Sequence, residues 1–334
     1  MPALSFHVVL LLVTAGAIYL SCEYFVNGVE WAGRKFNLEQ KATGTILAAF
    51  GTALPESVVT FVAVAFGHDE AAKQIGIGAA LGGPLVLATI AYATVSWVML
   101  AKRSGKAAAA PLNVDYRHLS RDQGWFLGIF VVKVALGLIA FTLKPWLGVL
   151  FLAAYAAYFR KETRGTVDEA EGALEPLTFA PRLAVPPTSL VLAQTLAALV
   201  AIFVASQVFV GQLDEITPYL GLSPQLVALL ISPIATELPE TMNAVIWVRQ
   251  GKERLALANI SGAMMIQATV PTAFGLFFTP WMLDRSLVWA GVVTAVSVAT
   301  LFSFFRRGAM TARLLSLFGL FYLVFAGALL WFGA

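Results

Sequence analysis

Apolar stretches long enough to cross a lipid bilayer follow one another along almost the whole chain, and they limit its fold more than any other feature. A membrane-spanning helix needs about 20 predominantly apolar residues. Ten such stretches can be placed, at 4–26, 42–66, 72–101, 124–143, 145–159, 189–211, 224–248, 255–280, 283–305 and 312–333. With 59% hydrophobic and 12% charged residues, the composition is that of an integral membrane protein.

The basic residues predict how the chain is oriented, because cytoplasmic loops of membrane proteins collect Lys and Arg. The loops after the odd-numbered stretches hold 18 of these residues and the loops after the even-numbered stretches hold 3. We therefore predict a multi-pass protein of the inner or plasma membrane with both termini outside. This asymmetry accounts for the net charge of +3 without a nucleic acid as partner.

The longest polar segment, 160–188, divides the chain into two parts. Its acidic run VDEAEGALE could bind a regulatory cation, but the acids lack the spacing of a calcium-binding loop. We interpret the segment as a cytoplasmic linker between a first five-helix unit, 1–159, and a second one, 189–334.

The two parts repeat each other in sequence. The segment that begins at Glu23 aligns without gaps to the one that begins at Gln207, and both contain Thr-x-Leu-Pro-Glu, at 52–56 and 236–240. The second and seventh stretches cross the membrane in opposite directions, so the repeats are inverted, a pattern typical of secondary transporters with a midplane site. We predict an all-α fold of ten transmembrane helices in two inverted five-helix repeats, with helices 2 and 7 broken and helices 3 and 8 irregular.

Each copy of the motif gathers oxygen ligands in the middle of a membrane helix. A carboxylate there costs about 2.5–3.5 kcal/mol on insertion scales, so Glu56 and Glu240 must face protein, water or a cation. Each proline frees the carbonyl four residues earlier, and each threonine lies one turn before its glutamate. The candidate ligands for a hard divalent cation are Thr52, Glu56, Thr236 and Glu240, with the carbonyls of Gly51 and Ala235. The alternative is two ordinary proline kinks beside packed or protonated glutamates.

On these residues the chain resembles the Ca²⁺/cation antiporter superfamily, the sodium/calcium exchanger membrane-region family. The resemblance covers the ten stretches, the long middle loop and the approach LGLSPQLVALLISPIATELPE to the second motif. It implies an antiporter that exchanges a divalent cation, Ca²⁺ above all, for H⁺ or Na⁺ by alternating access. It also implies that Thr52, Glu56, Thr236 and Glu240 bind the transported cations together with backbone carbonyls.

The chain departs from the family pattern at several ligand positions. Ala53 and Glu237 stand where the family usually has serine after the threonine. Four ligand positions of the following helices hold Gly83, Leu87, Ala263 and Gln267, of which only Gln267 is polar, although Asn259 and Gly262 of the motif are kept. We expect Gly78, Gly82, Ser261 and Gly262 to serve close helix packing.

These departures weaken the case for Na⁺ as the counter-ion. Glu237 lies three residues before Glu240, and two neighbouring carboxylates disfavour double ionisation, so the pair can share a proton. We therefore expect H⁺ to compete with a divalent cation for Glu56, Glu240 and Glu237. Alternatively, Glu237 faces the break in the opposite motif helix or an aqueous vestibule, and it changes only the local electric field. Asn243, three residues after Glu240, either orients that carboxylate or joins the site.

The remaining polar residues of the stretches favour no other function. Lys133 either extends to the interface or pairs with an acid, and Glu23 suits a packing or vestibule role. The histidines, His7, His68 and His118, are scattered and are predicted to share no helix face with acids, which argues against a metalloenzyme. A cation channel or a transport-inactive sensor of the same fold is the alternative function. We predict no cofactor, only the lipid bilayer and inorganic cations as partners, and no required oligomer.

Overall fold

The computed structural model describes residues 2–38, 42–66, 70–103, 105–163, 174–220 and 230–332. Within them the regular structure is helical apart from one isolated bridge between Pro111 and Thr311. The elements are α1 (Pro2–Lys35), η1 (Thr43–Ala48), α3 (Ala49–Phe66), α4 (Glu70–Val86), η2 (Leu87–Ala91), α5 (Tyr92–Lys102), α6 (Lys106–Ala109), α7 (Tyr116–Leu136), η3 (Lys144–Leu147), α8 (Gly148–Glu162), α9 (Thr188–Leu220), α11 (Ser232–Thr236), α12 (Leu238–Arg249), α13 (Glu253–Phe278), α14 (Arg285–Arg306), α15 (Ala312–Ser316) and α16 (Gly319–Phe332). The all-α prediction is confirmed.

Six helical segments of the described chain are long and apolar enough to cross a membrane. They are Leu4–Lys35, Gly76–Lys102, Thr188–Gln212, Glu253–Phe278, Arg285–Arg306 and Ala312–Trp331. The other four predicted spans correspond to helical segments that are shorter or more polar, namely η1 with α3, α7, α8, and α11 with α12. The number of ten spans and the inverted relation of the two halves therefore stay predictions.

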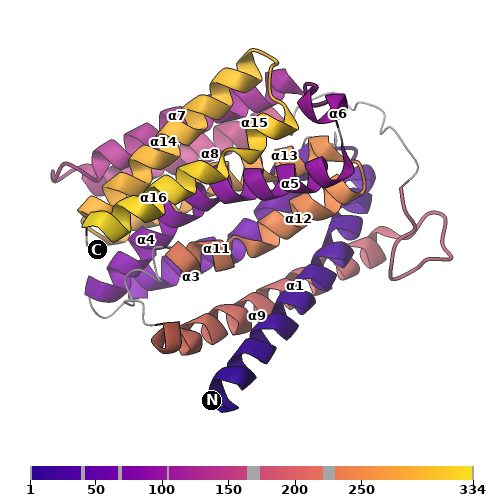
Figure 1. Cartoon of the computed structure of the whole chain (residues 1–334), viewed down its shortest axis with the longest axis horizontal. Helices are drawn as coiled ribbons and strands as arrows, with labels where there is room; N and C mark the ends of the chain where they lie inside the picture. The colour runs from indigo at the N-terminus through magenta and orange to yellow at the C-terminus, as the bar shows by residue number, and fades with distance from the viewer. Residues whose placement is uncertain are drawn as a thin grey trace.

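Helix α13 forms the centre of the molecule. In its most apolar window 83% of the residues are buried, against 11% for the corresponding window of α1. Helices α3, α4, α7, α8 and α12 pack against it. Figure 1 shows α1 and α9 side by side along one flank of the bundle, and α7 against α14. In both pairs the partners hold corresponding places in the two predicted repeats.

Helix α7 begins earlier and ends earlier than the predicted stretch 124–143. Asp115 caps its first turn by accepting a hydrogen bond from the main-chain N–H of His118 at 2.9 Å, and Gly137 ends the helix. The helix therefore includes His118 and Asp122, which lie one turn apart. The prediction that no histidine shares a helix face with an acid is wrong for this pair.

The two proline motifs differ in their backbone. In the second repeat a turn at Glu237 separates α11 from α12, and Pro239 lies in the first turn of α12, where a missing N–H is tolerated. In the first repeat α3 runs as one α-helix through residue 55, so the predicted break of helix 2 at Pro55 is wrong. The irregular segment lies upstream instead, as the π-helix η1. A membrane helix can absorb the lost hydrogen bond of a proline without interruption.

The two helices that follow the motifs also differ from each other. The predicted irregularity of helix 3 is present, because the π-helical segment η2 separates α4 from α5. Helix 8 was expected to be irregular as well, but α13 is uninterrupted although it contains Pro271. Pro271 leaves the Gln267 carbonyl without its helical donor, and Lys133 Nζ supplies one at 3.3 Å. This contact supports the continuous helix.

Candidate cation site

Glu240 marks the place where the two motif helices meet. It lies in the first turn of α12 and its side chain is inaccessible to solvent. Neither carboxylate oxygen has a hydrogen-bond partner among the residues that the structure describes. The buried Thr52 side chain of α3 lies beside this carboxyl group. Because the Thr52 hydroxyl donates its proton to the Ala48 carbonyl at 3.1 Å, its oxygen can offer lone pairs to a cation.

A second carboxylate lies close by, at the turn between α11 and α12. Glu237 is buried, and its Oε1 atom accepts a hydrogen bond of 2.7 Å from Gln267 Nε2 of α13. Gly83 of α4 gives both side chains room. A Cβ atom at that position would come within 2.4 Å of Glu237 Oε1 and 2.5 Å of Gln267 Oε1. Where the family pattern has a polar ligand in place of Gly83, the space is thus filled by Glu237 from the turn before α12 and by Gln267 from α13.

Two asparagines complete the polar surroundings of Glu240. Asn259 of α13 donates from Nδ2 to the Glu240 main-chain oxygen at 3.0 Å, which fixes the first turn of α12 against α13. Asn243 is buried in α12, and neither of its side-chain polar atoms has a hydrogen-bond partner within the described part of the chain. Asn259 was not among the predicted ligands, although its retention in the ANISGAMMIQ motif was a signal for it.

The structure places the other predicted ligands in different surroundings. Thr236 is half-buried, ends α11 and donates to the Pro233 carbonyl at 3.2 Å, so the turn at Glu237 separates it from the α12 face that carries Glu240. Ala235 is buried in the last turn of α11, two residues before Glu237. Gly51 lies against α1, where a Cβ atom would come within 2.8 Å of the Phe25 ring. The Glu56 side chain lies outside the described part of the structure.

The glycines expected to serve packing do so at two of three positions. A Cβ atom on Gly262 would lie 2.2 Å from the Thr45 carbonyl oxygen, and one on Gly82 would lie 2.7 Å from the Pro233 ring. At Gly78 the nearest atom would be 4.0 Å away, so close packing does not require glycine there. Ser261 accepts a hydrogen bond of 3.1 Å from Gln123 Nε2, which joins α13 to α7.

The contacts of Lys133 test the two roles predicted for it. Its side chain is buried and donates to main-chain carbonyls of Ala80 and Gln267, and its Nζ atom lies 5.2 Å from the centre of the Phe130 ring. Lys133 therefore neither reaches the interface nor pairs with an acid among the described residues. Glu23 is exposed and does not join the group around Glu240.

Comparison with known proteins identifies the family. The model of the family described as "Sodium/calcium exchanger protein" matches residues 6–160 and 190–332, which leaves out only the termini and the predicted linker. The chain belongs to this family. This chain is 24% identical over 305 residues to the CaxA protein of Alkalimonas amylolytica, and the alignment covers 87% of each protein. It is 23% identical over 282 residues to the inner membrane protein YrbG of Escherichia coli, with 82% of this chain and 81% of YrbG covered.

Solved structures show the same fold. A structure of the sodium-calcium exchanger NCX_Mj, soaked with 2.5 mM Na⁺ and 0.1 mM Ca²⁺, superposes with a TM-score of 0.76 at 20% identity. The match covers 97% of this chain and 98% of NCX_Mj. This exchanger-family chain is thus a multi-pass membrane protein with the fold of a cation antiporter, and its family is one of transporters rather than of enzymes.

Proposed function

We propose that this protein exchanges Ca²⁺, or another divalent cation, for H⁺ or Na⁺ across the membrane by alternating access. One observation carries the proposal: Thr52 from the first repeat lies beside the Glu240 carboxylate from the second, away from solvent. A buried carboxylate without hydrogen-bond partners is costly unless a cation or a proton neutralises it. Membership of the sodium/calcium exchanger family supports this reading.

We further propose that Glu56, Thr236 and the carbonyls of Gly51 and Ala235 complete the site with Thr52 and Glu240. Glu56 occupies the place in the first motif that Glu240 occupies in the second. Two carboxylates balance the charge of one divalent ion, and hydroxyl and carbonyl oxygens are the further ligands that such an ion prefers. The polar atoms of Asn243 and Asn259 Oδ1, which have no hydrogen-bond partner in the described chain, are available to orient these ligands.

Protons are the counter-ion that the second carboxylate favours. Glu237 and Gln267 occupy the space that Gly83 leaves open, where the family pattern places polar ligands for monovalent ions. Glu237 lies near Glu240, and the two carboxylates resist simultaneous ionisation. A divalent cation that neutralises the pair would displace a shared proton, which couples the two fluxes. We also propose that both termini lie outside and that 160–188 is cytoplasmic, as the distribution of basic residues predicts.

Reconstitution into proteoliposomes with an internal Ca²⁺ reporter tests this function. A Na⁺ gradient and a pH gradient are imposed in separate experiments, and the gradient that drives Ca²⁺ uptake identifies the counter-ion. Uptake that neither gradient drives would contradict antiport, and single-channel currents across a planar bilayer would favour a channel instead. Mn²⁺ and Sr²⁺ in place of Ca²⁺ define the selectivity for the divalent ion.

A further inference from the structure

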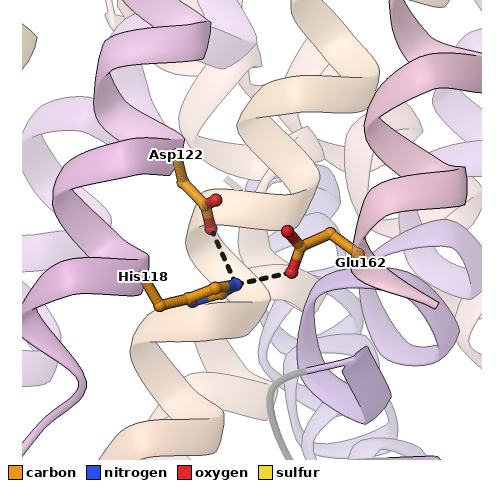
Figure 2. A group of neighbouring side chains, drawn as sticks. All are labelled: His118, Asp122 and Glu162. Atoms are coloured by element: carbon orange, nitrogen blue, oxygen red, sulfur yellow. Dashed lines mark hydrogen bonds and ion pairs between the residues drawn. The ribbon is translucent and has the colours of Figure 1, made fainter. Parts of the chain in front are cut away.

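A buried group of metal-ligating side chains lies away from the candidate transport site. His118 and Asp122 lie one turn apart on α7, and Glu162 is the last residue of α8 (Figure 2). Their residues are 4%, 1% and 2% exposed. His118 Nε2 is 2.5 Å from Glu162 Oε2 and 3.5 Å from Asp122 Oδ2. Each residue offers one atom that could bind a metal ion, and these three atoms lie within 4.8 Å of one another. Figure 2 shows both carboxylates directed at the imidazole ring.

Asp122 points to a ligand that completes this group. Neither of its carboxylate oxygens has a hydrogen-bond partner among the described residues, although the side chain is almost wholly buried. The nearest cationic atoms, His118 Nε2 and Arg121 Nη2, are 3.5 and 3.7 Å away, beyond hydrogen-bonding distance. The Tyr158 hydroxyl lies beside this carboxyl group. A buried carboxylate left in this way is costly unless it binds an ion.

We propose that His118, Asp122 and Glu162 bind one divalent transition-metal ion of the Zn²⁺ class, which links α7 to α8 at a site separate from the transport site. Imidazole nitrogen is a ligand that Zn²⁺ and its first-row neighbours accept well, whereas Ca²⁺ prefers oxygen ligands alone. The two carboxylates balance the charge of the ion. Three protein ligands leave a fourth tetrahedral position for water.

The geometry requires only a small adjustment. Ligand atoms at Zn²⁺ bond lengths of about 2.0–2.1 Å lie about 3.4 Å apart in a tetrahedron. The separation of 3.5 Å between His118 Nε2 and Asp122 Oδ2 already fits. The Glu162 oxygen at 2.5 Å must move away from the ring, which a rotation of its side chain achieves.

Arg121 supports the proposed site instead of competing with it. Its guanidinium group bonds Glu162 Oε1, the oxygen that does not face His118. A ligating carboxylate is commonly held by such a partner on its other oxygen, and the partner orients it toward the metal. Arg121 can therefore keep its hydrogen bond when Glu162 Oε2 binds the ion.

A cavity provides a way in for the ion. It has a volume of about 660 Å³ and is lined by His118 together with Asp115, Arg117, Ser120, Arg121 and Lys161, among others. This end of α7 belongs to the side that the basic residues predict to be cytoplasmic. Because the lining is mainly basic, it disfavours weakly held cations, and only an ion that forms strong bonds to the imidazole and both carboxylates is retained.

The test is Zn²⁺ titration of the full chain in detergent by calorimetry, carried out on the Glu240→Gln variant so that the transport site does not contribute. We expect one tight Zn²⁺ per chain. Asp122→Asn and His118→Gln, each added to that variant, should weaken its binding by at least about tenfold. Zn²⁺ should also raise the midpoint of thermal unfolding of the parent but not of these variants. His7→Gln and Glu253→Gln are matched controls elsewhere in the chain and should bind as the parent does.

Co²⁺ gives a second measurement that needs no substitution in the cluster. Tetrahedral Co²⁺ bound to the parent should show intense visible absorption bands that added Zn²⁺ abolishes. Absence of tight Zn²⁺ binding by the parent, or equal binding by both cluster variants, would overturn the proposal. Loss of binding in either variant that still elutes as a monodisperse peak supports it. None of these outcomes depends on Ca²⁺ transport, so the metal site and the antiport function fail or stand separately.

Discussion

Lys133 Nζ lies 3.3 Å from the main-chain oxygen of Gln267, the carbonyl that Pro271 deprives of its helical N–H donor. The same ammonium group donates at 2.6 Å to the Ala80 carbonyl, which Pro84 deprives in the same way within α4. One buried cation from α7 therefore satisfies both proline-freed carbonyls and ties α4 and α13 together. The helices it joins are those that carry Gly83 and Gln267 of the candidate site.

Replacing Lys133 with methionine should destabilise the protein. The variant keeps most of the apolar stem but leaves two buried carbonyls without a donor, at about 1–3 kcal/mol for each unsatisfied group. The ammonium group makes two hydrogen bonds and a ring contact, so we expect their loss to exceed the gain from no longer burying a charge. Thermal unfolding in detergent measures this. Lys102→Met, which removes an exposed lysine that donates to the Arg249 carbonyl, is the control and should leave the midpoint nearly unchanged.

Replacing Glu240 with glutamine should abolish cation uptake. The amide keeps the shape of the side chain but removes the charge that balances a divalent ion, so uptake in proteoliposomes should fall to the level of empty vesicles. Glu56→Gln should have the same effect. Glu253→Gln removes a carboxylate that pairs with Arg103 at 2.7 Å away from the site, and its uptake should remain near that of the parent. Transport retained by both site variants would remove the assignment of these residues.

Sequence patterns predicted the parts of the site that depend on local chemistry. Hydrophobic stretches and the repeated Thr-x-Leu-Pro-Glu motif are properties of short segments, so the all-α fold and the meeting of Thr52 with Glu240 could be expected from them. The turn before Pro239 followed from the proline itself. The unbroken helix through Pro55 did not, because a missing hydrogen bond can produce a bend, a break or neither, and packing decides which.

Contacts between distant segments that carry no repeated motif could not be predicted in this way. Gln267 was recognised as the polar exception in its motif, but its hydrogen bond to Glu237 depends on how α13 packs against the turn before α12. The sequence alone does not decide the role of Lys133, because both of its acceptors are main-chain atoms, which carry no sequence signal. Glu162 lies 44 residues from His118, and only the packing of α8 on α7 brings them together.

Replacing Glu237 with serine should weaken the pH dependence of exchange. In the parent a proton held between Glu237 and Glu240 competes with the divalent ion. Ca²⁺ uptake should therefore fall as the pH of the external solution, from which Ca²⁺ binds, falls. Without the second carboxylate this competition decreases, and the profile should become flatter. Initial uptake rates from pH 6 to 9, a range of about three units around neutrality, measure the effect. An unchanged profile would contradict the role of Glu237 in proton coupling, whereas loss of the slope in Glu237→Ser with retained uptake supports it.

Replacing Gly83 with alanine should impair transport while the fold is kept. A methyl group at this position would meet Glu237 Oε1 at 2.4 Å and Gln267 Oε1 at 2.5 Å, so the hydrogen-bonded pair must separate or shift away from α4. Both atoms are ends of flexible side chains, and the cost therefore falls on their arrangement rather than on the packing of the helices. We expect uptake to decrease by about tenfold, which corresponds to about 1.4 kcal/mol of lost interaction. Gly78→Ala lies on the same helix, where the nearest atom would be 4.0 Å from the new methyl group, and it should transport as the parent does. Equal uptake by the two variants would show that the room beside Glu237 has no part in transport.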